Sequence, residues 1–91
     1  SEPKVEESSR DKEIKKKRDE ILKKAEDECK KLKEDLKTKL EARKKELRER
    51  LSSEDQVNNI LTQESKKETD DVEAKCKKIM EEAQRNARTY R

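Results

Sequence analysis

Apolar residues recur along the first half of the chain at alternating steps of three and four positions. When Arg18 and Arg43 are placed in two gaps of the apolar pattern, the steps are 4, 3, 4, 4, 3, 4, 4, 3, 4 and 4, which form an eleven-residue repeat. This period keeps one narrow stripe on one side of a nearly straight helix, whereas a heptad repeat would supercoil the helix to the left. We therefore predict one long amphipathic helix over residues 9–51. The stripe consists of Ile14, Arg18, Ile21, Ala25, Cys29, Leu32, Leu36, Leu40, Arg43, Leu47 and Leu51.

The second half of the chain continues the same rhythm, which predicts a second helix over residues 54–91. Residues 1–8 precede the first stripe and contain the only proline. We expect 1–8 to be a flexible tail and 9–91 to be a single domain. The second stripe consists of Val57, Leu61, Ser65, Glu68, Val72, Cys76, Ile79, Ala83, Ala87 and Tyr90.

Two serines separate the halves and predict a reversal of the chain at 52–53. Ser52 with Asp55, and Ser53 with Gln56, both match the pattern of a helix-starting capping box. A short connection makes consecutive helices antiparallel neighbours. The predicted fold is therefore all-α, an extended antiparallel two-helix hairpin that resembles a coiled coil. The alternative is one uninterrupted helix over 9–91 in a parallel coiled coil, with both serines in solvent.

The two cysteines support the hairpin. If the chain reverses between Ser52 and Ser53, facing residues have numbers that add up to about 105, as those of Cys29 and Cys76 do. Both cysteines lie on the stripe, where neighbouring Cα atoms about 5.5 Å apart allow a disulfide. A disulfide would indicate an oxidising compartment and a secreted or extracellular protein. The alternative is a pair of reduced thiols packing as small apolar side chains in a cytoplasmic protein.

Composition argues against a compact globular domain, because 56% of the residues are charged and 25% are hydrophobic. Glycine is absent and strong helix formers dominate, so long solvated helices are favoured over disorder. No apolar run approaches the roughly 18 residues of a membrane span.

Catalytic and metal-binding patterns are missing from the sequence. Histidine is absent, and neither cysteine has another cysteine nearby to complete a zinc site. A two-helix rod also offers no dry cleft in which a carboxylate could become a general acid or base. We expect a protein that is not an enzyme and that needs no cofactor or metal.

A polar run from Gln63 to Asp71 faces Leu36 and Leu40 across the predicted hairpin. The second helix therefore offers these leucines little apolar cover. Either the hairpin is loosely packed here, or a helix from another protein or from a second copy covers them, as in a four-helix bundle. The candidate partner-binding residues are Leu36, Leu40, Leu61 and Met80.

Basic residues gather at the open end of the predicted hairpin and suggest a second kind of partner. Nucleic acid, anionic glycans or lipid headgroups could be held there by charge. Only Tyr90 is able to stack on a base, which argues against readout of a single strand. The candidate anion-binding residues are Lys15, Lys16, Lys17, Arg18, Arg85, Arg88 and Arg91.

The sequence thus favours an extracellular protein-binding or structural module that acts through helix-on-helix packing. An electrostatic binder of anionic partners is the main alternative. The uniform use of helix formers would also fit an excised or designed helical scaffold.

Overall fold

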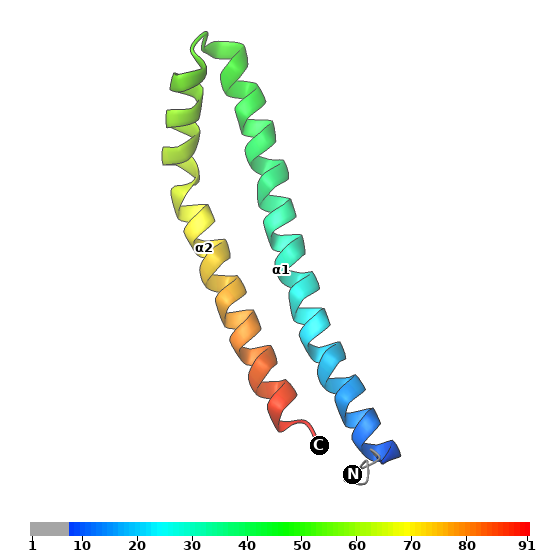
Figure 1. The fold of residues 1–91 in the computed structure, drawn as a ribbon. Coiled ribbons are helices and arrows are strands. Elements are labelled where there is room, and N and C mark those ends of the chain that lie inside the picture. Colours follow the sequence, from blue (N-terminus) through cyan, green and yellow to red (C-terminus); the bar gives the residue numbers. More distant parts are fainter. Residues whose placement is uncertain (1–7) are drawn as a thin grey trace, which may run out of the picture.

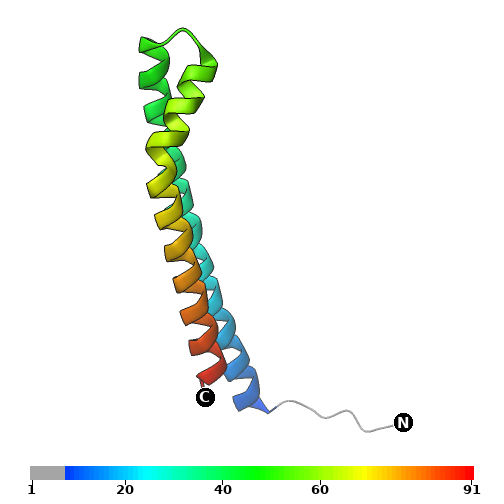
Figure 2. The ribbon, with the colours of Figure 1, turned by 90° about the vertical axis from the view of Figure 1, so that its left-hand side faces the viewer.

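The chain forms two long helices that lie side by side in opposite directions (Figure 1). The computed structural model describes residues 8–91, in which helix α1 spans Ser9–Arg50 and helix α2 spans Glu54–Thr89. The described part measures 71 × 24 × 20 Å, and in a view turned by 90° one helix lies in front of the other along most of the rod (Figure 2). The predicted hairpin is confirmed, and the uninterrupted helix is wrong.

The start of α1 is fixed by a complete capping box. The Ser8 hydroxyl accepts a hydrogen bond from the Asp11 backbone N–H at 3.0 Å, and the Ser8 N–H donates to the Asp11 carboxylate at 3.4 Å. These two bonds satisfy backbone donors that have no partner within the helix. Ser8 therefore belongs to the helix cap. Residues 1–7, the rest of the predicted flexible tail, lie outside the described part of the chain.

The turn uses Ser53, and not Ser52, to start α2. The Ser53 hydroxyl accepts a hydrogen bond from the Gln56 N–H at 3.4 Å, and the Ser53 carbonyl accepts one from Val57. Leu51 and Ser53 both have extended backbone conformations, and no residue of 8–91 has a positive φ. Because the turn needs no left-handed residue, it needs no glycine.

Both predicted helices are slightly too long at their C-termini. Leu51 caps α1 with an extended backbone while its N–H still donates to the Leu47 carbonyl at 2.9 Å. Tyr90 likewise caps α2. An apolar stripe does not show where a helix ends, because the residue after the last turn also packs against the neighbouring helix.

The eleven-residue stripe forms the contact between the helices. Every stripe position on both helices is buried or half-buried. Within residues 8–91, the buried residues toward the open end have small side chains, and the larger buried residues Leu47 and Val57 lie near the turn. Small side chains let helix backbones approach closely, so the contact between the helices, which we call the seam, is narrow in the open half. The buried residues are Ala25, Cys29, Leu47, Val57, Cys76, Ala83 and Ala87.

Charged residues cross the seam in the half nearer the turn. Arg43 forms a two-pronged pair with Glu64, both bonds being 2.8 Å long, and Lys39 pairs with Glu68 at 2.7 Å. Arg48 reaches Glu54 at the start of α2. These pairs connect the helices where the stripe itself is polar.

Candidate functional site

Cys29 and Cys76 lie directly opposite one another across the seam. The Cys29 thiol lies 3.6 Å from the Cys76 carbonyl oxygen, and the Cys76 thiol lies 3.8 Å from the Cys29 carbonyl oxygen. Each residue is 7% exposed. The predicted juxtaposition is confirmed. The predicted disulfide is not formed in this structure, where both cysteines are free thiols that donate to the carbonyl of the facing helix.

Burial raises the pKa of the Cys29 thiol, and its interaction with Cys76 raises that pKa further. The thiolate is the nucleophilic form of cysteine, so a raised pKa keeps this residue in its unreactive, protonated form at neutral pH. This environment is typical of a structural cysteine and differs from that of a catalytic one.

Leu36, Leu40 and Leu61 line one hollow on a single face of the hairpin, together with Val72. We call this the leucine hollow. All four side chains are half-buried, and no residue in 30–46 of α1 or 58–75 of α2 is fully buried. The hairpin therefore leaves part of its apolar surface uncovered in its middle section.

Met80 lines a neighbouring hollow together with Cys29 and Cys76, which we call the cysteine hollow. It shares Lys33 and Lys37 with the leucine hollow, so the two hollows lie on the same face. A third depression, around Leu22 on α1, shares Glu26 with the cysteine hollow. The structure thus brings all four predicted partner-binding residues onto one surface. We call the three depressions together the groove face.

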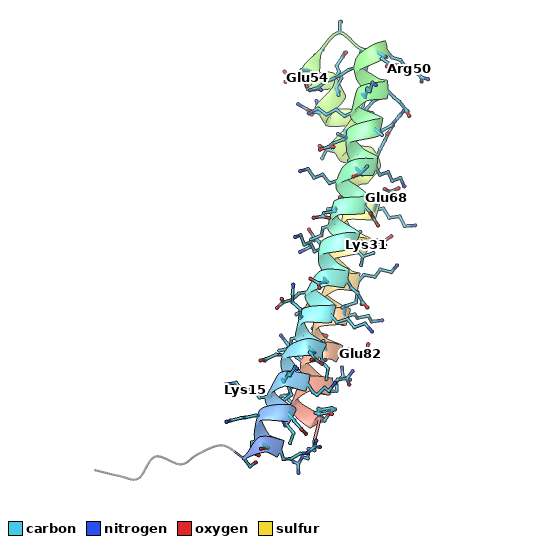
Figure 3. The ribbon with its side chains drawn as sticks, turned by 90° about the vertical axis from the view of Figure 1, so that its right-hand side faces the viewer. Lys15, Lys31, Arg50, Glu54, Glu68 and Glu82 are labelled. Atoms are coloured by element: carbon cyan, nitrogen blue, oxygen red, sulfur yellow. The ribbon has the colours of Figure 1, made fainter. Side chains whose placement is uncertain are left out.

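Lysines dominate the border of the groove face. Nine lysines and six carboxylates line its three depressions, so the border is net positive. Charged side chains extend on both sides along the whole hairpin (Figure 3). The bordering lysines are Lys12, Lys15, Lys16, Lys23, Lys30, Lys33, Lys37, Lys44 and Lys77, and the carboxylates are Asp19, Glu20, Glu26, Glu34, Glu41 and Glu73.

Arg18, one of the predicted anion-binding residues, caps the C-terminus of α2. Its Nη2 donates to the Tyr90 carbonyl at 2.9 Å and to the Arg88 carbonyl at 3.3 Å, while its Nε is buried without a hydrogen-bond partner. Cations at a helix C-terminus bind carbonyls that have no partner within the helix and favour the helix dipole. Arg18 therefore joins the two helices at the open end.

The other predicted anion-binding residues are exposed. Lys17 pairs with Glu20 at 3.5 Å within α1. Lys15 and Lys16 line the depression around Leu22, so they belong to the groove face. The remaining three are exposed arginines near the end of α2, Arg85, Arg88 and Arg91.

The interhelical ion pairs and the role of Arg18 were not predicted from the sequence. A signal for the ion pairs was present, because the residue numbers of Arg43 and Glu64 add up to nearly the same value as those of the cysteines.

Within residues 8–91, no three Cys, Asp or Glu side chains are grouped so that they could hold a metal ion. Neither of the two described helices has the length and apolar character needed to cross a membrane.

Comparison with known proteins gives no match, since no family model, curated protein or solved structure is significantly similar to the chain.

Proposed function

We propose that this protein is a non-enzymatic helical module that binds an acidic amphipathic helix of another protein along its groove face. The observation that carries the proposal is the leucine hollow, where Leu36 and Leu40 of α1 stay half-buried because α2 is polar opposite them, and where Leu61 of α2 adds further apolar surface. Apolar surface that a narrow helical hairpin cannot cover is typically covered by a further helix.

The shape and charge of the groove face support a helical partner. The depressions follow one another along the hairpin, so an aligned helix would place apolar residues at spacings of three and four into them. The lysine-rich border would face the flanks of that helix, and acidic flanks would complement it.

A disulfide that joins the two helices, which we call the clamp, is part of the proposed function. We infer that Cys29 and Cys76 form a disulfide in the working protein, since the fold already places the two residues opposite each other. Such a bond implies an oxidising compartment, so we propose that the protein acts outside the cytosol. It would keep the helices together beside the leucine hollow.

Binding of designed peptides tests the proposed helix partner. The probe is a fluorescent, Leu-containing amphipathic helix with glutamate flanks, compared with the same helix with lysine flanks. We expect the glutamate peptide to bind more tightly at low salt. Leu40→Glu should weaken binding at least tenfold, about 1.4 kcal/mol, because it places a charge on the apolar floor.

Thr38→Glu is the matched control, because Thr38 is an exposed residue of the same helix that does not line the groove face. It should leave the affinity unchanged. Equal binding of both peptides would contradict the acidic partner, and failure of both to bind would contradict the helix-binding function. Self-association that Leu40→Glu abolishes, measured by sedimentation, would instead assign the groove face to a second copy.

A further inference from the structure

The cysteine hollow combines two opposed thiols with an excess of positive charge. Cys29 and Cys76 lie on its floor, and four lysines, two glutamates and Met80 complete its lining. Lysines around a depression raise the local concentration of anions there. The lining lysines are Lys30, Lys33, Lys37 and Lys77, and the glutamates are Glu26 and Glu34.

The hollow also gives a reagent a route to the sulfur atoms. Each cysteine retains 7% of its surface, and both border a depression that is open to solvent. The neighbouring stretch of the hairpin, over 30–46 and 58–75, has no fully buried residue. Local separation of the helices beside the cysteines therefore costs less than separation at the better packed turn.

We propose that a small anionic disulfide, such as oxidised glutathione, oxidises Cys29 and Cys76 to an interhelical disulfide after the lysines of the cysteine hollow attract it. The inference deepens the proposed clamp, on which it rests, by naming the co-reactant and its route.

The reaction is two successive thiol–disulfide exchanges. The thiolate of one cysteine attacks a glutathione sulfur, the glutathione S–S bond breaks, and one glutathione thiolate leaves with the electron pair. The second cysteine then attacks the protein sulfur of this mixed disulfide and displaces the second glutathione. Two electrons pass from the protein sulfurs to glutathione. The two protons lost by the cysteines balance the two glutathione thiols that are released.

The environment of the thiols determines what the lysines contribute. Because burial raises the pKa of the Cys29 thiol, exchange at neutral pH is slow, and the rate depends on how often a reagent occupies the hollow. An anionic disulfide should occupy it more often than a cationic one. The rate should also rise with pH, as more thiolate forms.

The test compares three disulfides of different charge on the full chain, namely oxidised glutathione (anionic), hydroxyethyl disulfide (neutral) and cystamine (cationic). Alkylation of remaining thiols followed by intact-mass measurement gives the rate of intrachain oxidation. Each rate is divided by the rate of the same reagent with N-acetylcysteine amide, which removes differences in intrinsic reactivity. At low salt we expect the normalised rates to fall in the order glutathione, hydroxyethyl disulfide, cystamine.

A pair of double variants shows whether the hollow is responsible. Lys30→Gln with Lys77→Gln removes two charges from the hollow and should slow oxidation by glutathione about fourfold, roughly twofold per charge at low salt. Lys31→Gln with Lys45→Gln removes two charges from exposed positions that do not line the hollow, and the rate should stay unchanged. Hydroxyethyl disulfide should react equally with all three proteins.

Three results would overturn the inference in distinguishable ways. Equal normalised rates for glutathione and cystamine would exclude the lysine-guided route, while the clamp itself would stand. Equal slowing by the two double variants would show that overall charge, and not the hollow, guides the reagent. Failure of all three reagents to produce an intrachain disulfide, even at alkaline pH, would remove the clamp. Peptide binding is a separate measurement and does not depend on any of these outcomes.

Discussion

Arg43 and Glu64 show how charged side chains take over the seam where the apolar stripe is interrupted. Arg43 occupies a stripe position between leucines, and it is held by Glu64 across the seam and by Glu46 one turn along α1. The hydrogen bonds that Arg43 donates to Glu64 and Glu46 raise the pKa of Arg43, and those that Glu64 accepts from Arg43 lower the pKa of Glu64. Solvent screens this exposed pair, so its contribution to stability is small.

Acid should weaken the seam through Glu64. Because its pKa is lower in the folded chain than the ordinary 4.5, Glu64 stabilises the hairpin above pH 4.5, and this contribution is lost as the pH falls through the folded value. Urea unfolding at a series of pH values should show a free energy of unfolding that declines below pH 4.5. Glu64→Gln should make the decline shallower.

The free energy of unfolding of Glu64→Gln should still decline in part below pH 4.5, because Arg48 also lowers the pKa of Glu54. Glu49→Gln, at an exposed position of α1, serves as the control for removing a carboxylate. An equal flattening by Glu49→Gln would show that general charge, and not the pair with Arg43, sets the acid response.

At the scale of the helices, the periodic stripe predicted both helices and the surface through which they pack against each other. Every position on the eleven-residue repeat faces the other helix, including Arg18 and Arg43. The register between α1 and α2 could also be predicted, because Cys29 and Cys76 face each other across the seam. The arrangement of Leu36, Leu40, Leu61 and Met80 on one face was not predictable, since it depends on how far each helix is rotated about its axis.

Which serine caps α2 could not be predicted either, because Ser52 and Ser53 both have a suitable partner three residues later. The structure selects Ser53, so Ser53→Ala should cost about 1 kcal/mol of stability, whereas Ser52→Ala should change it by less than about 0.5 kcal/mol. Thermal unfolding followed by circular dichroism measures both. A larger loss for Ser52→Ala would place the cap one residue earlier.

The molecule as a whole is a thin rod, and a clamp should therefore have a large effect on it. A disulfide between Cys29 and Cys76 closes a loop of about 48 residues, which stabilises the fold by about 4 kcal/mol in the chain-entropy model. For a chain of this size we expect the melting temperature of the oxidised protein to exceed that of the reduced protein by about 15 to 30 °C.

Cys76→Ala provides the control for this comparison, because it keeps a small apolar side chain in the seam. Its melting temperature should be close to that of the reduced protein and should not respond to oxidant. If oxidised and reduced wild-type protein melt together, the proposed clamp contributes nothing to the fold.

The middle of the rod differs from both ends in a way that affects its motions. Arg18 holds the open end through the Tyr90 and Arg88 carbonyls, and Leu47 and Val57 are buried near the turn. Between them, residues 30–46 and 58–75 contain no buried side chain and are linked across the seam by exposed pairs such as Arg43 with Glu64. Concentrated salt weakens such exposed pairs and spares apolar contacts. In concentrated salt the two helices should therefore separate first in this middle section, before they fray at the open end or at the turn. Backbone amide exchange should be fastest there.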